Sequence, residues 1–208
     1  DPYSVEASIS RLPYVRSYTP ADVSSSSVPA SSIVTYRFNP SKLNDSKVKF
    51  TWMDGGLRPS QPDQIKEDIG VGGILIYGEK GIISCNDYGT RAKLYIDGEV
   101  VETGNFDGIP SNSFNHYTSW VEAMVDGYGS DKHKNLNSGF DVAGPISEVV
   151  LLGNVAVRSG LLKRSPRSNV FIGRKRLDYD SKNMVITNFD QANQFLTREY
   201  RKGWELNI

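Results

Sequence analysis

The chain has 208 residues, with 24 Lys and Arg balanced by 24 Asp and Glu. A chain of this length buries roughly 70% of the surface that it exposes when unfolded, so its core requires neither disulfides nor a metal. A formal net charge of zero gives no electrostatic attraction to nucleic acid or to an anionic membrane, and we expect neither partner. No apolar run approaches the roughly 20 residues of a membrane helix, so we expect no membrane span.

The first third of the chain reads as strands separated by loops. Residues 4–11 alternate apolar and polar side chains, the pattern of a half-buried strand. Proline and serine dominate residues 12–32, which we expect to form a long surface loop. Strands rich in β-branched and aromatic residues follow at 32–38 and 47–53, and Asp54 with two glycines ends the second of them.

The middle third contains two predicted strand pairs and a helix. Residues 72–85 read as a β-hairpin with its turn at 78–81, and residues 93–101 read as a second pair around Asp97 and Gly98. Apolar and aromatic residues then recur at helical spacing over 113–126, so a helix is expected there.

The longest apolar stretch spans residues 139–160. Because proline is tolerated in the first turn of a helix, the pattern predicts a helix from Pro145 to Ser159 that packs on a sheet. Glu148 lies inside this apolar helix, and a carboxylate there requires a partner. Arg158 or a lysine from the sheet is the expected partner, and a structural role is favoured over an acid–base role.

The last third completes the expected fold. Residues 177–187 hold one or two short strands, and a final helix is expected from Asn188. Strands interrupted by three helices predict an α+β fold: an open, largely antiparallel sheet with helices packed on one face, in a single domain over residues 1–208.

The residues alone show no complete catalytic constellation. The sequence lacks GxGxxG, Walker and GxSxG motifs, and the glycines at 70–73 lead into a strand, the wrong context for dinucleotide binding. His116 and His133 are the only histidines and have no cysteine or carboxylate at ligand spacing, so no metal site is expected. The single cysteine, Cys85, is expected in the core rather than as a nucleophile.

Four side chains are candidates for contact with a sugar-like substrate, and each has a structural alternative. Asp54 and Arg58 follow an aromatic strand, where a plain turn aspartate is the alternative. Tyr88 offers a stacking surface or packs within a hairpin, and Trp52 is expected to pack in the core. His116 at a helix start either faces a cleft or caps and packs the helix.

Several phrases of the chain together resemble one family. They occur in the family's order and cover nearly the whole chain: KFTWMDGGLRP at 49–59, GGIL at 72–75 with GEKG at 78–81, His116 with Trp120 and Ala123, EVVLLGN at 148–154 with Ala156, Arg158 and Gly160, and the tail from Leu177 to Trp204. This pattern is similar to the C-terminal domain of Gfo/Idh/MocA oxidoreductases, in the branch common in Bacteroidetes and planctomycetes.

The resemblance implies a function for the whole protein rather than for this chain. Such proteins bind NAD or NADP in an N-terminal Rossmann domain and act on a sugar, cyclitol or related polyol. The family's catalytic lysine and Asp/His helix match no position here, so the resemblance implies that the Rossmann domain and these residues would precede Asp1. We therefore expect no catalytic residue, no bound cofactor and no activity in the isolated chain.

The resemblance also implies that the chain forms a wall of the substrate cleft and assembles into homo-oligomers through the open sheet face. Asp54, Arg58, Tyr88 and His116 are the substrate-facing candidates, with Arg11 as a further one. A non-catalytic carbohydrate-binding or assembly module, and part of an NAD-dependent glycoside hydrolase of the same family, remain alternatives. Export signals are common in this branch, which favours the periplasm over the cytoplasm.

Overall fold

The computed structural model describes residues 1–10, 29–42, 44–101, 115–168 and 170–205. The chain divides into two compact units. Unit 1 comprises Asp1–Leu57 and Asn137–Ile208, and unit 2 comprises Arg58–Leu136. Each unit contains an open antiparallel sheet, and helices make up the rest of the regular structure, so the α+β class is confirmed. The expectation of a single domain stays a prediction.

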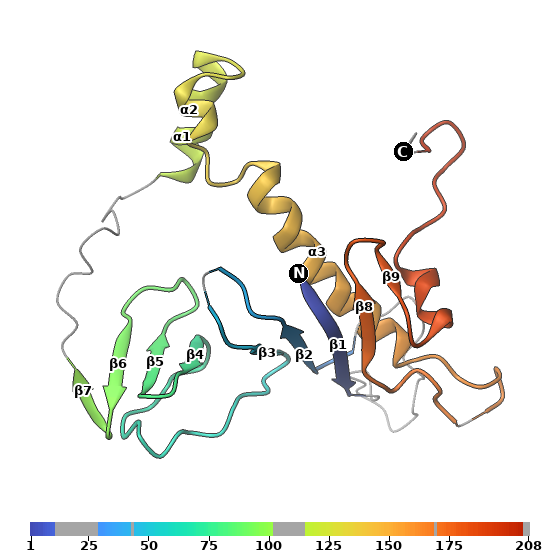
Figure 1. Ribbon diagram of the computed structural model, residues 1–208, viewed down its shortest axis with the longest axis horizontal. Coiled ribbons are helices and arrows are strands. Elements are labelled where there is room, and N and C mark those ends of the chain that lie inside the picture. Colours follow the sequence, from blue (N-terminus) through green and yellow to red (C-terminus); the bar gives the residue numbers. More distant parts are fainter. Residues whose placement is uncertain (11–28, 43, 102–114, 169, 206–208) are drawn as a thin grey trace. The chain divides into compact units, whose positions relative to one another are not determined.

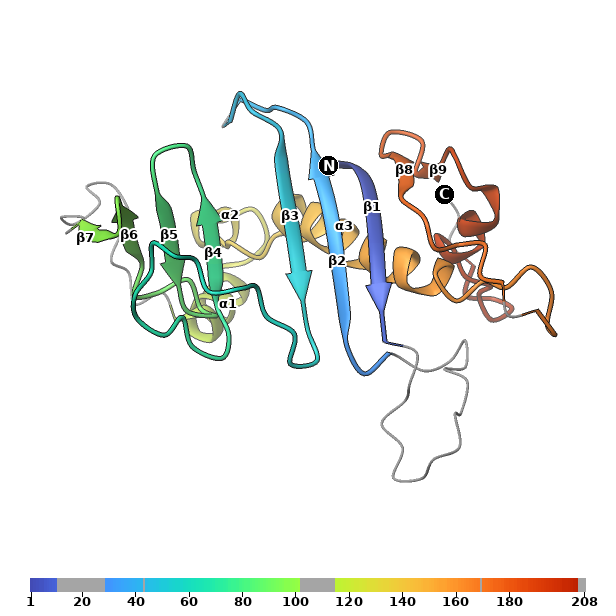
Figure 2. The ribbon, with the colours of Figure 1, turned by 90° about the horizontal axis from the view of Figure 1, so that it is seen from below.

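Unit 1 is built on a five-stranded sheet with the order β3-β2-β1-β8-β9. Its strands are β1 (Pro2–Ile9), β2 (Ser32–Phe38), β3 (Val48–Met53), β8 (Leu177–Asp180) and β9 (Val185–Ile186). All neighbouring strands pair antiparallel. Because β1 pairs with β8, segments from near both ends of the chain lie side by side in this sheet. Figure 2 shows β3, β2 and β1 side by side, with α3 (Phe140–Ser159) behind them.

Helix α3 forms the core of unit 1 with the sheet. Its last turns bury Leu152, Gly153, Val155, Ala156 and Ser159. These residues face β1 and β2, where Val5, Val34 and Tyr36 are also buried. By length and composition α3 also resembles a membrane span, with a mean hydropathy of 1.4. Only 22% of this apolar stretch is buried: the last turns pack on the sheet, whereas Ile146, Val150 and Leu151 are exposed.

All three helices differ from their predicted bounds. Helix α1 (His116–Asp126) covers only part of the predicted range 113–126, of which residues 113 and 114 lie outside the described residues. Helix α3 begins at Phe140, five residues before Pro145, and the amides of Val142 and Ala143 bond to the Gly139 carbonyl. Pro145 therefore lies inside the helix rather than in its first turn, where it lacks one backbone hydrogen bond and its ring crowds the Asp141 carbonyl. The final helix is only a 3-10 segment, η1 (Asp190–Phe195).

Unit 2 contains a four-stranded sheet with the order β4-β5-β6-β7 (Figure 1). Its strands are β4 (Ile74–Tyr77), β5 (Ile82–Cys85), β6 (Lys93–Ile96) and β7 (Glu99–Val101), as both predicted strand pairs require. The amide of Gly78 bonds to the Gly81 carbonyl at 2.9 Å and closes the predicted turn. The unit also includes α1 (His116–Asp126) and the short α2 (Asp131–Lys134).

One face of the unit 2 sheet is covered by the segment before β4. Ile65 from this segment packs with Ile82 and Tyr95, and all three are buried. Glu67 bonds Lys93 Nζ at 2.7 and 2.8 Å and accepts a further hydrogen bond from the Tyr95 hydroxyl. The hydrogen bond from Lys93, followed by that from Tyr95, lowers the pKa of Glu67. Glu67 therefore fastens the segment to the sheet.

Glu67→Gln is expected to lower the stability of unit 2 at neutral pH, because it removes the ion pair with Lys93. A carboxylate whose folded pKa is lowered stabilises the fold above its unfolded pKa, and this stabilisation is lost as the pH falls through the folded value. The difference in the free energy of unfolding between wild type and Glu67→Gln, which we call the gap, should thus narrow below about pH 4. Urea denaturation across pH measures it, with Glu79→Gln as an exposed control. A gap that is constant from neutral to acid pH would contradict this role.

Candidate functional site

The two faces of the unit 1 sheet differ in chemistry. Strand alternation places Val5, Val34 and Tyr36 on the face that α3 covers. Their neighbours in the strands point to the opposite face. We call this opposite face the open face, and strand register aligns its side chains in rows across the sheet.

The first two rows of the open face are polar and the third is partly apolar. From one strand to the next, the first row runs through Lys49, Arg37, Ser4 and Asp178, the second through Thr51, Thr35 and Glu6, and the third through Met53, Ile33 and Ser8. The hydroxyls of Thr35 and Thr51 lie 3.4 Å apart. Ser4 is fully buried, so the open face presents the hydroxyls of Thr35 and Thr51 and several charges beside a small apolar area.

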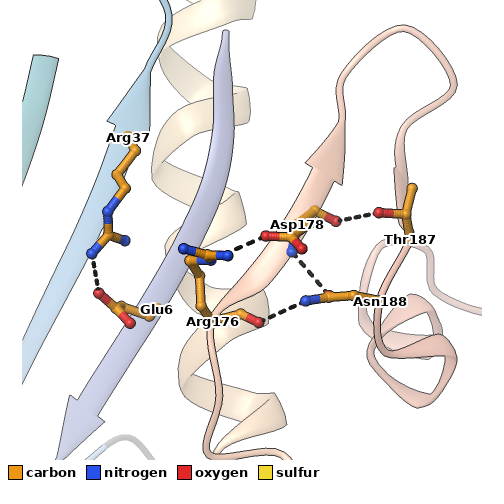
Figure 3. Close-up of polar contacts among 6 residues, drawn as sticks. All are labelled: Glu6, Arg37, Arg176, Asp178, Thr187 and Asn188. Atoms are coloured by element: carbon orange, nitrogen blue, oxygen red, sulfur yellow. Dashed lines mark hydrogen bonds and ion pairs between the residues drawn. The ribbon is translucent and has the colours of Figure 1, made fainter. Parts of the chain in front are cut away.

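Two ion pairs dominate this surface. Arg37 Nη2 donates to Glu6 Oε1 at 2.7 Å, and Arg176 Nε donates to Asp178 Oδ1 at 3.1 Å (Figure 3). Within the described part of the chain, Arg37 Nη1 and Ser4 Oγ are buried without a hydrogen-bond partner. A buried unpartnered donor costs about 1–3 kcal/mol, so this row carries polar groups that packing alone does not explain.

Residues after β9 hold the outer ion pair in place. Asn188 accepts a hydrogen bond from the Asp178 amide at 2.9 Å and donates to the Arg176 carbonyl at 3.0 Å. Thr187 Oγ1 donates to the Asp178 carbonyl at 3.3 Å (Figure 3). These contacts fix the backbone that carries Arg176 and Asp178, so the two charges have a defined position at the start of β8.

Asp54, a predicted candidate, lies just after β3 in unit 1. Its Oδ1 accepts from the Ser32 amide and its Oδ2 from the Ser32 hydroxyl, both at 2.7 Å. The indole of Trp52, which is 55% exposed rather than packed in the core, donates to Oδ2 at 3.2 Å. Both oxygens thus tie the ends of β2 and β3 together, which favours the structural alternative for Asp54.

The other three described candidates belong to unit 2. Arg58 Nη1 donates to the Gly70 carbonyl at 3.1 Å, and the Tyr88 ring is 89% exposed in a turn held by Asn86. His116 is the exposed first residue of α1, and Asn115, not His116, caps this helix. No bond or ring contact between described residues of unit 2 joins these three side chains. Their substrate role stays a prediction, and Arg11 lies outside the described residues.

Glu148 has a different partner from the expected one. The Tyr179 hydroxyl donates to Glu148 Oε1 at 2.8 Å, whereas the Arg158 guanidinium lies 4.4 Å from the centroid of the Phe195 ring. Burial, and then this hydrogen bond, raise the pKa of Tyr179 well above its usual range. Glu148 therefore joins α3 to β8 as a structural anchor. Tyr179 was not predicted because the register of β8 is a long-range property.

The glycine segment at residues 70–73 does not fit the pyrophosphate of a dinucleotide. A Cβ at Gly72 in the glycine segment would lie 2.6 Å from Asp87 Oδ1, and a carboxylate so close to this backbone disfavours a pyrophosphate. The segment also enters strand β4 rather than a helix N-terminus. The described residues contain no group of three or more metal-ligating side chains.

The comparisons with known proteins do not assign a family. No protein-family model and no curated protein matches this chain. The open face of unit 1 is therefore the strongest candidate site, on its chemistry alone.

Proposed function

We propose that this chain is the C-terminal substrate-binding and assembly domain of an NAD(P)-dependent oxidoreductase that acts on a sugar, cyclitol or related polyol. The open face is the wall against which the polyol lies, and the chain also assembles into homo-oligomers. Two lines support this proposal: the family-like motifs along the chain and the chemistry of the open face.

The observation that carries the proposal is the pairing of hydroxyls with ion pairs across the first two rows. A polyol presents several hydroxyls, each of which donates and accepts hydrogen bonds. Carboxylates such as Glu6 accept from such hydroxyls, and guanidinium groups such as Arg37 donate to them. Ile33 and Met53 offer the apolar contact that the C–H groups of a ring require.

Chemistry that transfers a hydride is assigned to residues outside this chain. NAD or NADP would bind to the dinucleotide-binding domain of the whole protein, and residues 70–73 do not fit it. The chain alone is thus proposed to be inactive and to bind no cofactor. A non-catalytic carbohydrate-binding module would use the same open face, and the coding sequence before Asp1 separates the two proposals. A dinucleotide-binding fold encoded there supports the oxidoreductase, and its absence refutes it.

Calorimetry of the chain with a panel of hexoses and cyclitols tests the open face directly. We expect dissociation constants of roughly millimolar for at least one member, because one wall of a cleft makes only part of the contacts. Arg37→Met should weaken this binding about tenfold by removing a charged donor. The exposed Lys202→Met serves as the control and should bind normally. Micromolar binding of NAD to the chain would refute the assignment of the cofactor to another domain.

A further inference from the structure

Charge is unevenly distributed between the two units. Unit 1 contains 17 Lys and Arg against 12 Asp and Glu, a net charge of +5. Unit 2 contains 7 Lys and Arg against 12 Asp and Glu, a net charge of −5. The zero net charge of the whole chain therefore conceals two opposite surfaces, and such surfaces on identical molecules attract one another.

The positive charge of unit 1 is concentrated near the end of α3. Residues 149–177 contain seven Lys and Arg and no Asp or Glu. Residues 161–175, which we call the basic hairpin, fold back through a bridge between Lys163 and Phe171. The Arg164 amide bonds to the Val170 carbonyl at 2.9 Å and supports this turn. The basic hairpin thus carries Lys163, Arg164, Arg167, Arg174 and Lys175 close together.

Aromatic rings hold several of these cations in place. The Arg174 guanidinium lies 4.2 Å and the Lys163 ammonium 5.5 Å from the centroid of Phe171. Lys175 lies 4.7 Å from the centroid of Phe189. Cations held over rings lose less entropy when they bind a partner. A nucleic acid base could stack on these rings only by displacing a cation, which disfavours single-stranded nucleic acid as the partner.

The negative charge of unit 2 includes a cluster at the turn between β6 and β7. Asp97 and Glu99 lie in or beside this turn, and a Cβ at Gly98 would lie 3.9 Å from the Gln64 carbonyl oxygen. Gln64 therefore lies next to Gly98. Asp63, which directly precedes Gln64 in the sequence, adds a third exposed carboxylate to the cluster. Lys66 offsets this charge only through an exposed pair with Glu99 at 3.5 Å. We call Asp63, Asp97 and Glu99 the acidic turn.

We propose that the basic hairpin of one copy docks on the acidic turn of a second copy. The two surfaces are exposed, opposite in charge and located on different parts of the chain, so the contact is heterologous and joins copies head to tail. This interface uses neither the rows of the open face nor a substrate, and it holds whether or not the proposed enzymatic function is correct. Because both surfaces are solvated, salt weakens the contact.

Charge reversal in the full chain tests this contact by sedimentation velocity at about 50 mM and about 500 mM salt. We expect self-association at the lower salt that weakens at the higher one. Arg164→Glu with Arg167→Glu should weaken it about tenfold or more, and so should Asp63→Lys with Glu99→Lys. A mixture of these two double variants should associate again, because each supplies the charges that the other has lost.

The control is Lys42→Glu with Lys182→Glu, which reverses two exposed cations outside the basic hairpin and should associate like wild type. Circular dichroism confirms that each variant is folded. The proposal is overturned if the chain remains monomeric at low salt, if either double variant associates as strongly as wild type, or if the mixture of the two double variants fails to associate. Equal weakening by the control variant would also overturn it.

Discussion

Gly173→Ala should destabilise unit 1 by about 3 kcal/mol, the largest effect that we expect from a single methyl group. A Cβ at Gly173 would overlap the carbonyl oxygen of Ser159 and lie 2.7 Å from its carbonyl carbon. Both atoms belong to the backbone at the end of α3, so no side chain can rotate away. The close approach of the basic hairpin to α3 therefore requires glycine at position 173, because any larger residue would place a Cβ against the Ser159 carbonyl.

The matched control for this substitution is Gly144→Ala in the same unit. A Cβ at Gly144 meets no heavy atom of the described chain within 4 Å, and alanine favours a helix by up to about 1 kcal/mol over glycine. Urea denaturation should thus show a lower midpoint for Gly173→Ala and an unchanged or higher one for Gly144→Ala. Equal midpoints for the two variants would show that the approach of residue 173 to α3 is wrong.

Gly153→Ala should destabilise unit 1 by about 1–3 kcal/mol, and Tyr36→Phe should relieve much of that loss. A Cβ at Gly153 would overlap the hydroxyl of Tyr36, but it would lie 3.3 Å from Cζ of the same ring and 3.5 Å from Cγ1 of Val34. Removal of the hydroxyl leaves only these tight but tolerable contacts. The clash is therefore specific to one oxygen atom.

A double-mutant cycle measures this coupling between α3 and β2. The double variant should be more stable than the sum of the two single effects predicts, by about 1 kcal/mol or more. Tyr36→Phe alone reports the cost of losing the hydroxyl. Strict additivity of the two substitutions would contradict the packing of Gly153 against Tyr36.

Local patterns were sufficient to predict most of the strands. The alternation from Val5 to Ile9 and the turn glycines at 78 and 81 each depend on neighbours in sequence, and the structure confirms both elements. Helix ends were harder to predict. Pro145 is compatible with several positions near a helix start, and the hydrogen bonds between Asn193 of the 3-10 segment and the backbone of Ile186 are not visible in the apolar spacing.

The candidate site depends on strand register, which the sequence does not reveal. Alternation alone places Glu6 on the face opposite Val5, but it does not show that Arg37 from β2 lies beside it. The pairing of β1 with β8 places Asp178 beside Ser4 in the first row, although the two residues are more than 170 positions apart in the sequence. Asp54 was identified by its position before two glycines, and its carboxylate instead bonds to Ser32.

The central claim is that the open face of unit 1 binds a polyol. Residue-resolved NMR of the chain, titrated with the sugar or cyclitol that binds best by calorimetry, tests it most directly. We predict that the amide shifts concentrate at Glu6, Thr35, Arg37, Thr51 and Asp178 and that Arg37→Met requires about tenfold more ligand to produce the same shifts. Shifts confined to the face under α3 or to unit 2, or no shifts up to roughly 10 mM ligand, would contradict the claim.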